Sequence, residues 1–293
     1  NIKPFLGNNS SFKKMKIINL DQTEYKKLAA KSYDLEKRRL RIEFLKLQED
    51  VIKNNRRICI VFEGRDTAGK STAIRFFSEY LMPKHFNYIQ LGIPTKWESS
   101  HWFQRWSKVI PKNGQISFLD RSWYTRAITE PIMGYCTENQ YRAFMRKVNN
   151  WEEELISDGV ELTKFYFSLS KDQQKIRMEA RKNSKLKYWK LSKNDEKVIT
   201  KWNAFTLYKE QMFEKTGTEV SPWVSINSNN KMIARLTSLR YLLNKTEYHG
   251  KKILKPEKWS KSLNNYSTNL EGVKFDNLSY EQFMVISKYS DDI

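Results

Sequence analysis

The sequence predicts an α/β fold in which a parallel sheet of five strands is covered by helices on both faces. Short apolar runs alternate along the chain with longer amphipathic stretches, an order typical of parallel strands joined by helices. The run from Ile58 to Phe62 is apolar throughout and is bounded by charged residues, as expected for a strand buried on both faces. A glycine-rich segment at 64–71 follows that run and leads into a helical pattern, which indicates a strand, a tight loop and a helix in succession.

Each element is predicted from its pattern of apolar residues. Residues 25–55 predict one long amphipathic helix, because apolar residues recur at three- to five-residue steps among charged ones. The strands are expected at 58–62, 87–91, 115–119, 162–169 and 223–226. The further helices are expected at 69–82, 96–109, 138–157, 171–182, 193–213 and 229–245. The pattern weakens beyond residue 249, and no element is predicted there.

The chain is expected to form one domain with extensions at both ends. The expected divisions are a leader or flexible N-terminus at 1–24, a helical extension at 25–56, the central domain at 57–249 with a lid at about 171–193, and a C-terminal extension at 250–293. No apolar run reaches the roughly eighteen residues of a membrane-spanning helix. The two cysteines, Cys59 and Cys136, are too few for a disulfide framework, which favours a cytoplasmic location.

The net charge gives the first indication of a partner. The chain has 53 Lys and Arg residues against 33 Asp and Glu residues, a net charge of +20 that attracts polyanions. Residues 57–246 carry +13 of this charge, and residues 247–293 carry no net charge. A basic tail that binds nucleic acid is therefore disfavoured, and neither nucleic acid nor a membrane is expected as a partner. The alternative is that many of the lysines serve only solubility.

The segment at 64–71, Gly-Arg-Asp-Thr-Ala-Gly-Lys-Ser, fits the phosphate-binding pattern G-x-x-x-x-G-K-S/T without a mismatch. Its glycines let the backbone curl so that N–H groups face phosphate oxygens, and the helix that follows favours negative charge at its N-terminus. Lys70 is expected to reach the outer phosphates, and Ser71 to lie beside a magnesium ion. The phosphate-binding positions predicted here are Gly64, Arg65, Thr67, Ala68, Gly69, Ser71 and Thr72.

Two aspartates are candidate ligands for magnesium, with manganese as the alternative metal. Asp66 lies inside the loop, where a carboxylate would repel phosphate unless a cation came between them; it could instead stabilise the turn. Asp120 ends a predicted strand, the position of the magnesium-orienting acid in phosphate-loop proteins, although an ordinary strand-end acid is the alternative. Arg121 follows directly, and its guanidinium is suited to bridging donor and acceptor phosphates.

A basic segment at 171–193 is the third functional feature. It contains nine Lys and Arg residues against two acidic ones. Arg177 and Arg181 are four residues apart and so lie on one face of the predicted helix. Because this segment follows the fourth strand, we expect a helical lid that closes over the phosphates and excludes water. A solvated basic helix is the alternative.

Other candidate residues carry weaker signals. The histidines, which show no metal-ligand spacing, are expected to be structural: His85, His101 and His249. Trp123 and Tyr124 are expected to pack rather than to stack on a base. The acidic run at 152–154 suggests a solvated helix face.

With these motifs in place, the chain resembles the polyphosphate kinase 2 family over about residues 28–246. The resemblance rests on FEGRDTAGKS at 62–71, PTKWESSHWFQRW at 94–106, LDRSWYTRA at 119–127 and EPIMGYC at 130–136. It continues through DGVELTKFYFSLSKDQQKIRMEAR at 158–181, YWKLSKND at 188–195 and SPW at 221–223. Several motifs in order are more specific than a phosphate loop alone. The resemblance implies a thymidylate-kinase-like P-loop kinase fold of three α/β/α layers, a helical lid, magnesium dependence and a homo-oligomer, either a dimer or a tetramer.

The resemblance also implies roles for residues at matching positions. Asp66 and Asp120 would hold magnesium, while Lys70 and Arg121 would bind phosphates at the point of transfer. The lid would contribute Arg177, Arg181 and the polyphosphate contact Lys190, and Arg126 and Glu130 are further candidates without an assigned role. One departure is that Ser71 and Thr72 stand where glycine often follows the loop lysine, which leaves a different metal coordination open.

Together these features predict a polyphosphate kinase that moves a phosphoryl group reversibly between inorganic polyphosphate and a nucleotide. The expected acceptors are ADP, GDP, AMP or GMP, with ATP or GTP on the other side of the reaction. Direct in-line transfer needs no strong general base, because the acceptor is already a phosphate anion. The alternatives are an ATP-dependent nucleoside monophosphate kinase and a polyanion-binding protein without catalysis.

Overall fold

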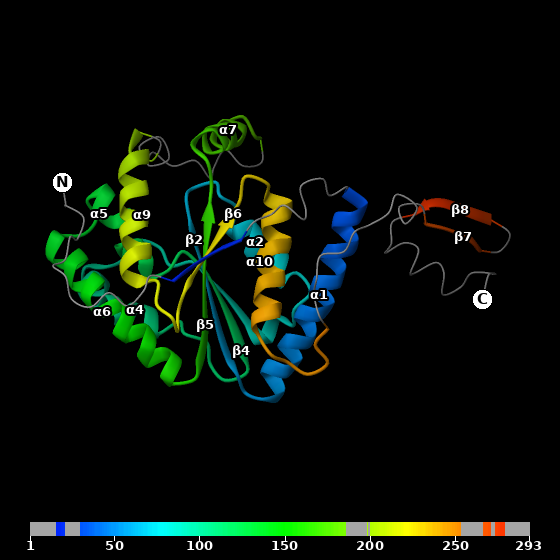
Figure 1. Ribbon diagram of the computed structural model, residues 1–293, viewed down its shortest axis with the longest axis horizontal. Helices are drawn as coiled ribbons and strands as arrows, with labels where there is room; N and C mark the ends of the chain where they lie inside the picture. Colours follow the sequence, from blue (N-terminus) through cyan, green and yellow to red (C-terminus); the bar gives the residue numbers. More distant parts are fainter. Residues whose placement is uncertain are drawn as a thin grey trace.

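The computed structural model describes residues 16–20, 30–185, 198, 200–252, 266–270 and 273–278. Its centre is one six-stranded parallel sheet with the strand order β1-β6-β5-β2-β4-β3 (Figure 1). The strands are β1 (Ile17–Leu20), β2 (Arg57–Gly64), β3 (Phe86–Ile89), β4 (Gln115–Asp120), β5 (Val160–Ser168) and β6 (Trp223–Asn227). All five strands expected from the sequence are present, and the predicted α/β fold with a parallel sheet is confirmed.

The number of strands is a correction, because β1 was not predicted. It lies in the segment 1–24 that was expected to be a leader or flexible N-terminus, and it pairs in parallel with β6, with Ile17 opposite Trp223. Lys16 extends the pairing, since its carbonyl accepts a hydrogen bond from the Trp223 N–H at 3.3 Å. A four-residue strand carries too short a periodic signal to be recognised. Its structure depends on the edge that β6 offers more than 200 positions later in the chain.

The helices follow the expected order with some changes of length. The longer ones are α1 (Ala30–Lys53), α2 (Lys70–Ser78), α6 (Glu138–Ser157), α7 (Lys171–Lys182), α9 (Trp202–Thr216) and α10 (Lys231–Lys245). The shorter ones are α3 (Lys96–Ser100), α4 (Trp102–Ser107), α5 (Thr129–Met133) and the 3-10 turns η2 (Pro83–His85) and η3 (Trp123–Arg126). The single helix expected at 96–109 is interrupted at His101, whose φ of −114° and ψ of 56° are not helical.

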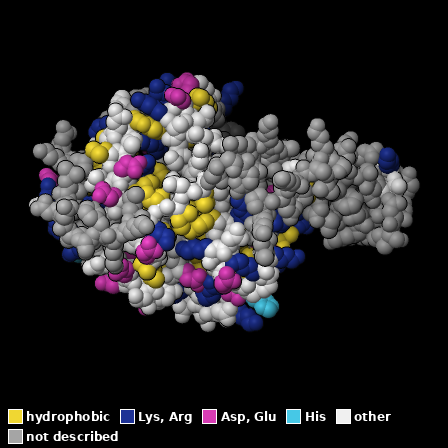
Figure 2. Space-filling view, in the orientation of Figure 1, with side chains coloured by type: hydrophobic (Ala, Val, Ile, Leu, Met, Phe, Trp, Pro, Cys, Tyr) yellow, Lys and Arg dark blue, Asp and Glu magenta, His cyan; other side chains and the backbone are white. Residues whose placement is uncertain are grey.

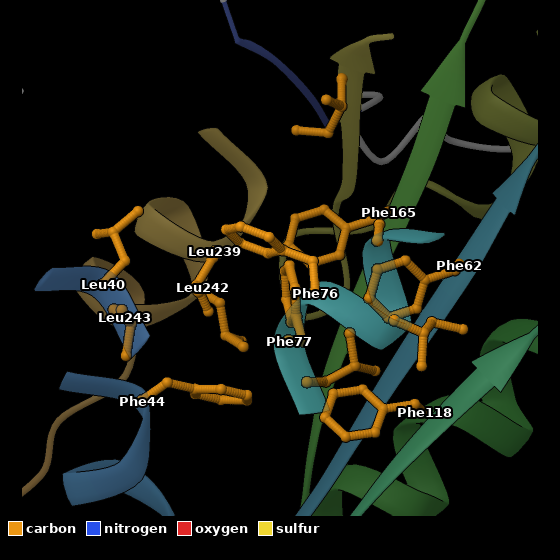
Figure 3. Close-up of a cluster of buried hydrophobic side chains, with 14 of the residues drawn as sticks. Leu40, Phe44, Phe62, Phe76, Phe77, Phe118, Phe165, Leu239, Leu242 and Leu243 are labelled. Carbon is orange, nitrogen blue, oxygen red and sulfur yellow. The ribbon is translucent and has the colours of Figure 1, made fainter. Parts of the chain in front are cut away.

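Two hydrophobic cores lie on opposite faces of the sheet, and the side chains of β2 alternate between them. Ile60 and Phe62 point into the core covered by α1, α2 and α10, which Figure 3 shows in close-up. Val61 points into the core on the face of α4, α6 and α9. In the first core, the ring of Phe62 lies 5.4 Å from that of Phe77 and 5.7 Å from that of Phe165. The central strand is therefore buried on both faces, as its apolar sequence predicts.

Glu152 corrects the expectation of a solvated face at 152–154. Its side chain is buried and pairs with the Lys164 ammonium of β5 at 2.7 Å. The same carboxylate accepts hydrogen bonds from Trp123 Nε1 at 2.9 Å, Tyr124 Oη at 2.7 Å and Ser221 Oγ at 3.1 Å. Each added hydrogen bond offsets part of the cost of burying the charged pair. Trp123 and Tyr124 are buried packing residues, as predicted.

Further expectations concern the cysteines, the membrane and the C-terminal segment. Cys59 and Cys136 are both free and buried. Within the described ranges, we find no helix with the length and apolar character needed to cross a membrane. In the segment 250–293, where no element was predicted, β7 (Tyr266–Leu270) and β8 (Val273–Leu278) pair as an antiparallel hairpin.

Helix α1 contributes side chains to the hydrophobic core of the domain. The Phe44 ring is buried and lies 5.7 Å from Phe77 and 6.3 Å from Phe118. Phe44→Ala is therefore expected to lower the free energy of unfolding by about 3–5 kcal/mol. Ile42 is 46% exposed on the same helix, and Ile42→Ala is the matched control with little effect. Urea unfolding measures both, and equal stabilities for the two variants would contradict the assignment of α1 to the core.

Candidate functional site

The candidate site lies where the carboxyl ends of the central strands meet. The phosphate loop follows β2, Asp120 ends β4, and α7 begins shortly after β5. Phe62 of β2 pairs with Asp120 on one side and with Phe165 of β5 on the other, so parallel pairing brings these segments to one edge of the sheet. Figure 1 shows α7 beyond the tip of β5 at this edge. Ligands of open parallel sheets commonly bind at this edge.

The phosphate loop depends on backbone conformations and close approaches that favour glycine. Gly64 has a φ of 139°, and a Cβ there would lie 2.4 Å from the carbonyl oxygen of Phe167. Gly69, with a φ of 106°, stands directly before α2. Thr67 and Arg121 are two of the three non-glycine residues with positive φ in the described chain, and both belong to this site. Such conformations concentrate at functional sites because surrounding contacts hold them in place.

Lys70 folds back over the loop. Its buried ammonium donates hydrogen bonds to the carbonyl of Gly64 at 2.9 Å and to that of Arg65 at 3.0 Å. Burial and the charge of Arg121 hold the pKa of Lys70 below its ordinary value, against the opposite effects of nearby carboxylates. The lysine is thus folded over the loop from the first position of α2, and its predicted contact with the outer phosphates stays a prediction.

Asp66 and Arg121 form an ion pair across the site. The Asp66 carboxylate accepts a hydrogen bond from the Arg121 guanidinium. Burial raises the pKa of Asp66, but the charges of Arg121, Lys70 and Arg181 outweigh burial and leave that pKa below its ordinary value. Arg121 is held in its left-handed conformation by a 3.1 Å hydrogen bond from its backbone N–H to the carbonyl of Phe62. The structure therefore brings together two residues 55 positions apart that the sequence assigned to one centre.

Asp120 receives two hydroxyl donors on a single oxygen. Ser71 Oγ donates to Asp120 Oδ2 at 2.5 Å, and Tyr88 Oη donates to the same oxygen at 2.8 Å. Among the described residues, no hydrogen bond reaches Asp120 Oδ1. Burial, together with the charge of Asp120, raises the pKa of Tyr88 to about 12, so its hydroxyl keeps its proton at neutral pH.

These residues fit a magnesium ion that arrives with phosphate. In the described part of the chain, no group of three or more His, Cys, Asp or Glu side chains could enclose a metal. Magnesium bound through one or two carboxylates, substrate phosphates and waters needs no such group. Asp120, the adjacent Ser71 hydroxyl and Asp66 supply the hard oxygen donors. Thr67 Oγ1 is buried without a described hydrogen-bond partner, and a phosphate oxygen would satisfy it.

Helix α7 is attached to the phosphate loop by its polar side chains. Gln174 Nε2 donates to the carbonyl of Asp66 at 3.0 Å, and Arg177 donates to that of Thr67 at 3.2 Å. Arg177 also donates to the carbonyls of Ser228 at 2.7 Å and Asn229 at 2.8 Å. The predicted phosphate ligand Arg177 therefore joins three backbone segments in this structure.

The remaining lid predictions have different outcomes. Arg181 is half-buried, and its charge lowers the pKa of Asp66. Arg181 therefore acts electrostatically on the site. Figure 2 shows Lys and Arg side chains over α7 at the top of the molecule. Lys190 lies outside the described residues, so its polyphosphate contact stays a prediction.

The other predicted loop residues mainly hold the loop in shape. The Arg65 guanidinium lies 3.3 Å above the Trp202 ring and donates to Thr206 Oγ1 at 2.7 Å, which ties the loop to α9. Thr72 Oγ1 donates to the carbonyl of Gly69 at 2.8 Å. The Ala68 N–H donates to the carbonyl of Arg65 at 3.2 Å. Phosphate binding by Arg65 stays a prediction: its Nη2 is held by Thr206, whereas its Nη1 is buried without a described hydrogen-bond partner.

Arg126 and Glu130 form a separate buried cluster. The Arg126 guanidinium pairs with the Glu130 carboxylate, donates to the carbonyl of Ser99 at 3.2 Å and lies 4.0 Å over the Trp102 ring. Burial raises the pKa of Glu130, against the opposing charge of Arg126. The described hydrogen bonds and ion pairs do not join these two residues to the phosphate loop. The pair instead connects η3 and α5 to α3 and α4.

Glu63 and Tyr88 are among the site residues that the sequence analysis missed. Glu63 is buried and accepts hydrogen bonds from both the backbone N–H and the hydroxyl of Ser122, each at 2.7 Å, which fixes the turn after Asp120. Burial raises the pKa of Glu63, against Ser122 and the nearby cations. An acid at the end of an apolar strand was a usable signal for Glu63. Tyr88, in the middle of a predicted strand, had none.

The sequence profile of the polyphosphate kinase 2 family matches residues 27–253. The chain belongs to this family. The matched region contains the phosphate loop, the strand-end pair Asp120 and Arg121, and helix α7. Strand β1 precedes the matched region.

Individual relatives agree with this assignment. A GDP-polyphosphate phosphotransferase of Mycolicibacterium smegmatis is 42% identical over 220 residues, which are 75% of this chain and 78% of the relative. NDP-polyphosphate phosphotransferase 2 of Ruegeria pomeroyi is 40% identical over 77% of this chain and 66% of its own length. The crystal structure of polyphosphate kinase 2 from Arthrobacter aurescens TC1 has a TM-score of 0.72 at 23% identity, covering 88% of this chain and 92% of that one. This likeness supports the P-loop kinase fold.

The ion pair in the site predicts a measurable change of pKa. Arg121→Gln removes the largest charge that opposes burial, so the pKa of Asp66 is expected to rise. Carboxyl ¹³C NMR titration measures this value. Arg142→Gln is the control, because Arg142 pairs with Glu138 on the exposed face of α6. An unchanged Asp66 pKa in Arg121→Gln would contradict the assigned cause.

The same pair sets a pH dependence of stability. Because the folded-state pKa of Asp66 is lowered, its stabilisation is present above the ordinary aspartate pKa and is lost as pH falls through the folded-state value. In Arg121→Gln this acid-sensitive contribution should shrink. Unfolding free energies measured across the acidic range would show the difference, and parallel curves for the two proteins would contradict it.

Proposed function

We propose that this protein transfers a phosphoryl group reversibly between inorganic polyphosphate and a nucleoside diphosphate. One observation carries the proposal: in a chain of the polyphosphate kinase 2 family, Lys70, the Asp66–Arg121 pair and the Ser71–Asp120 pair converge at one edge of the sheet. This arrangement combines a phosphate-binding loop with cations for the transferring group. The high positive charge of the chain suits a donor with about one negative charge per phosphate unit.

The chemistry asked of the residues is mainly positioning and electrostatic stabilisation. An oxygen of the acceptor diphosphate forms a bond to the terminal phosphorus of polyphosphate, and the bond from that phosphorus to the next bridging oxygen breaks. The shortened polyphosphate leaves as an anion. Lys70 and Arg121 stabilise the charge on the transferring group, and the loop N–H groups orient its oxygens. No proton has to be removed from the acceptor.

The acids and the lid complete this mechanism. A magnesium ion held by Asp120 and Asp66 together with phosphate oxygens would neutralise charge on both phosphate chains. The two acids would orient that ion, with Ser71 beside Asp120. Helix α7, attached to the loop through Gln174 and Arg177, covers the loop backbone and limits the access of water, which is a competing acceptor.

Two alternatives predicted from the sequence are less well supported. An ATP-dependent nucleoside monophosphate kinase would share the phosphate loop and Asp120, but the family and the names of the relatives favour polyphosphate. A binding protein without catalysis would not need Lys70, Asp66 and Arg121 to converge. Relatives named for GDP and for NDP favour a diphosphate acceptor, with GDP and ADP as the first candidates and monophosphates as a further possibility.

The remaining properties stay predictions. Magnesium as the metal, with manganese as a substitute, is supported by the oxygen donors of the site. A homo-oligomer, either a dimer or a tetramer, and a cytoplasmic location are expected from the sequence and the family resemblance.

The proposal is tested by nucleotide turnover with the purified protein. ADP, GDP, AMP and GMP are each incubated with Mg²⁺ and long-chain polyphosphate, and products are followed by chromatography; parallel reactions contain ATP in place of polyphosphate. Lys70→Ala is expected to lower kcat by about 10²–10³-fold. Lys84→Ala, at an exposed position in η2, is the control that keeps activity. Transfer from ATP alone would reject the proposal in favour of the monophosphate kinase.

Removal of the metal gives an independent check. Excess EDTA is expected to abolish turnover, since the phosphate charges near Asp66 and Asp120 would then be unneutralised. Added Mg²⁺ should restore activity, and Mn²⁺ should replace it in part. Full turnover in excess EDTA would show that Asp66 and Asp120 do not act through a metal.

A further inference from the structure

Tyr88 reaches the strand-end acid from the neighbouring strand. Its hydroxyl donates to Asp120 Oδ2 at 2.8 Å and lies 3.5 Å from Gln90 Oε1. A phenol has one proton to donate, and the distances assign it to Asp120. The side chain is 47% exposed, so burial alone does not hold the ring in this place.

The sheet register explains how the two residues meet. Tyr88 of β3 pairs with Phe118 of β4, and Asp120 lies two positions further along β4. Residues two apart on a strand project from the same face, so Tyr88 and Asp120 are diagonal neighbours across the two strands. The long phenol spans this diagonal. A shorter hydroxyl side chain at position 88 would not reach.

We propose that Tyr88 is a positioning residue for Asp120: together with Ser71 it holds Oδ2 of that carboxylate, so that Oδ1 is presented to the cation that accompanies the phosphates. This inference rests on the proposed function. The carboxylate torsion of aspartate is broad, and a single hydrogen bond leaves it freedom to turn. Two donors from different segments, the start of α2 and β3, fix the carboxylate plane before substrate arrives.

The two donors, Ser71 and Tyr88, are expected to differ in whether they can also contact the metal. The Ser71 hydroxyl donates its hydrogen bond to Asp120, which leaves the lone pairs of its oxygen for the cation that the sequence predicts beside it. Tyr88 approaches from β3, at the edge of the sheet. Partners that orient a metal ligand in this way typically change metal affinity or activity by about 10–100-fold when they are removed.

Because the ring of Tyr88 is exposed, an alternative role for this residue is to stack on a nucleotide base. The two roles depend on different atoms. Tyr88→Phe removes the hydroxyl and keeps the ring, whereas Tyr88→Leu removes both. Tyr80→Phe is the matched control, because Tyr80 is 56% exposed and no described hydrogen bond involves its hydroxyl.

The test measures metal binding and turnover separately on the full chain. Electron paramagnetic resonance follows Mn²⁺ binding in the presence of saturating ADP, and turnover is recorded over a range of Mg²⁺ concentrations. Tyr88→Phe is expected to weaken Mn²⁺ binding by about 10–100-fold. It should also raise the Mg²⁺ concentration for half-maximal turnover, with kcat at saturating Mg²⁺ and the thermal midpoint close to those of the unmodified protein. Tyr80→Phe should match the unmodified protein in every measurement.

Two outcomes would overturn the proposal. The first is unchanged Mn²⁺ binding in Tyr88→Phe. The second is a normal Mg²⁺ dependence in Tyr88→Phe combined with a raised KM for nucleotide in Tyr88→Leu, which would assign the ring to base stacking. The Mn²⁺ measurement needs no phosphoryl transfer. A protein that fails to use polyphosphate but loses Mn²⁺ affinity on Tyr88→Phe would therefore refute the proposed function and keep the role of Tyr88.

Discussion

Strand β2 is paired in parallel with β4 on one side and with β5 on the other, and the remaining architecture depends on these two pairings. Because these three strands run in the same direction, their carboxyl ends lie at one edge of the sheet. The phosphate loop, the acid that ends β4 and the helix after β5 are thereby close in space although they are far apart in the sequence. The pairing of β2 with β5 constrains the loop most directly at Gly64, where the Phe167 backbone leaves no room for a side chain. Catalytic geometry here is a consequence of sheet topology.

The charges of the site balance one another within the protein. Lys70 is held by loop carbonyls, Asp66 by Arg121, and Asp120 by two hydroxyls. Each group is thus ordered before any substrate is bound, which lowers the reorganisation needed when a phosphate chain enters.

The sequence predicts those parts of the fold and site that are determined by neighbouring residues. The loop at 64–71 was recognisable because its pattern, the strand before it and the helix after it are contiguous, and Asp120 and Arg121 because they directly follow an apolar run. Contacts between distant residues were not predictable. Strand β1 has only four residues, the partner of Glu152 is a lysine within an apolar strand, and Tyr88 gains its role from the register of β3 against β4. Arg177 was expected in a lid over the phosphates, and its backbone partners belong to segments that the local pattern does not identify.

The pairing of β1 with β6 joins the first described strand to the last strand of the parallel sheet. Lys16 and Glu219, which form an ion pair beside this pairing, are 203 residues apart. Closing so long a loop is slow, because the entropy of the intervening chain must be lost before the new contacts form. On the ribosome β1 is made before β6, and it has no edge to join until β6 has been synthesised. Its docking would then mark the completion of the sheet, after the phosphate loop and its neighbouring strands have already assembled.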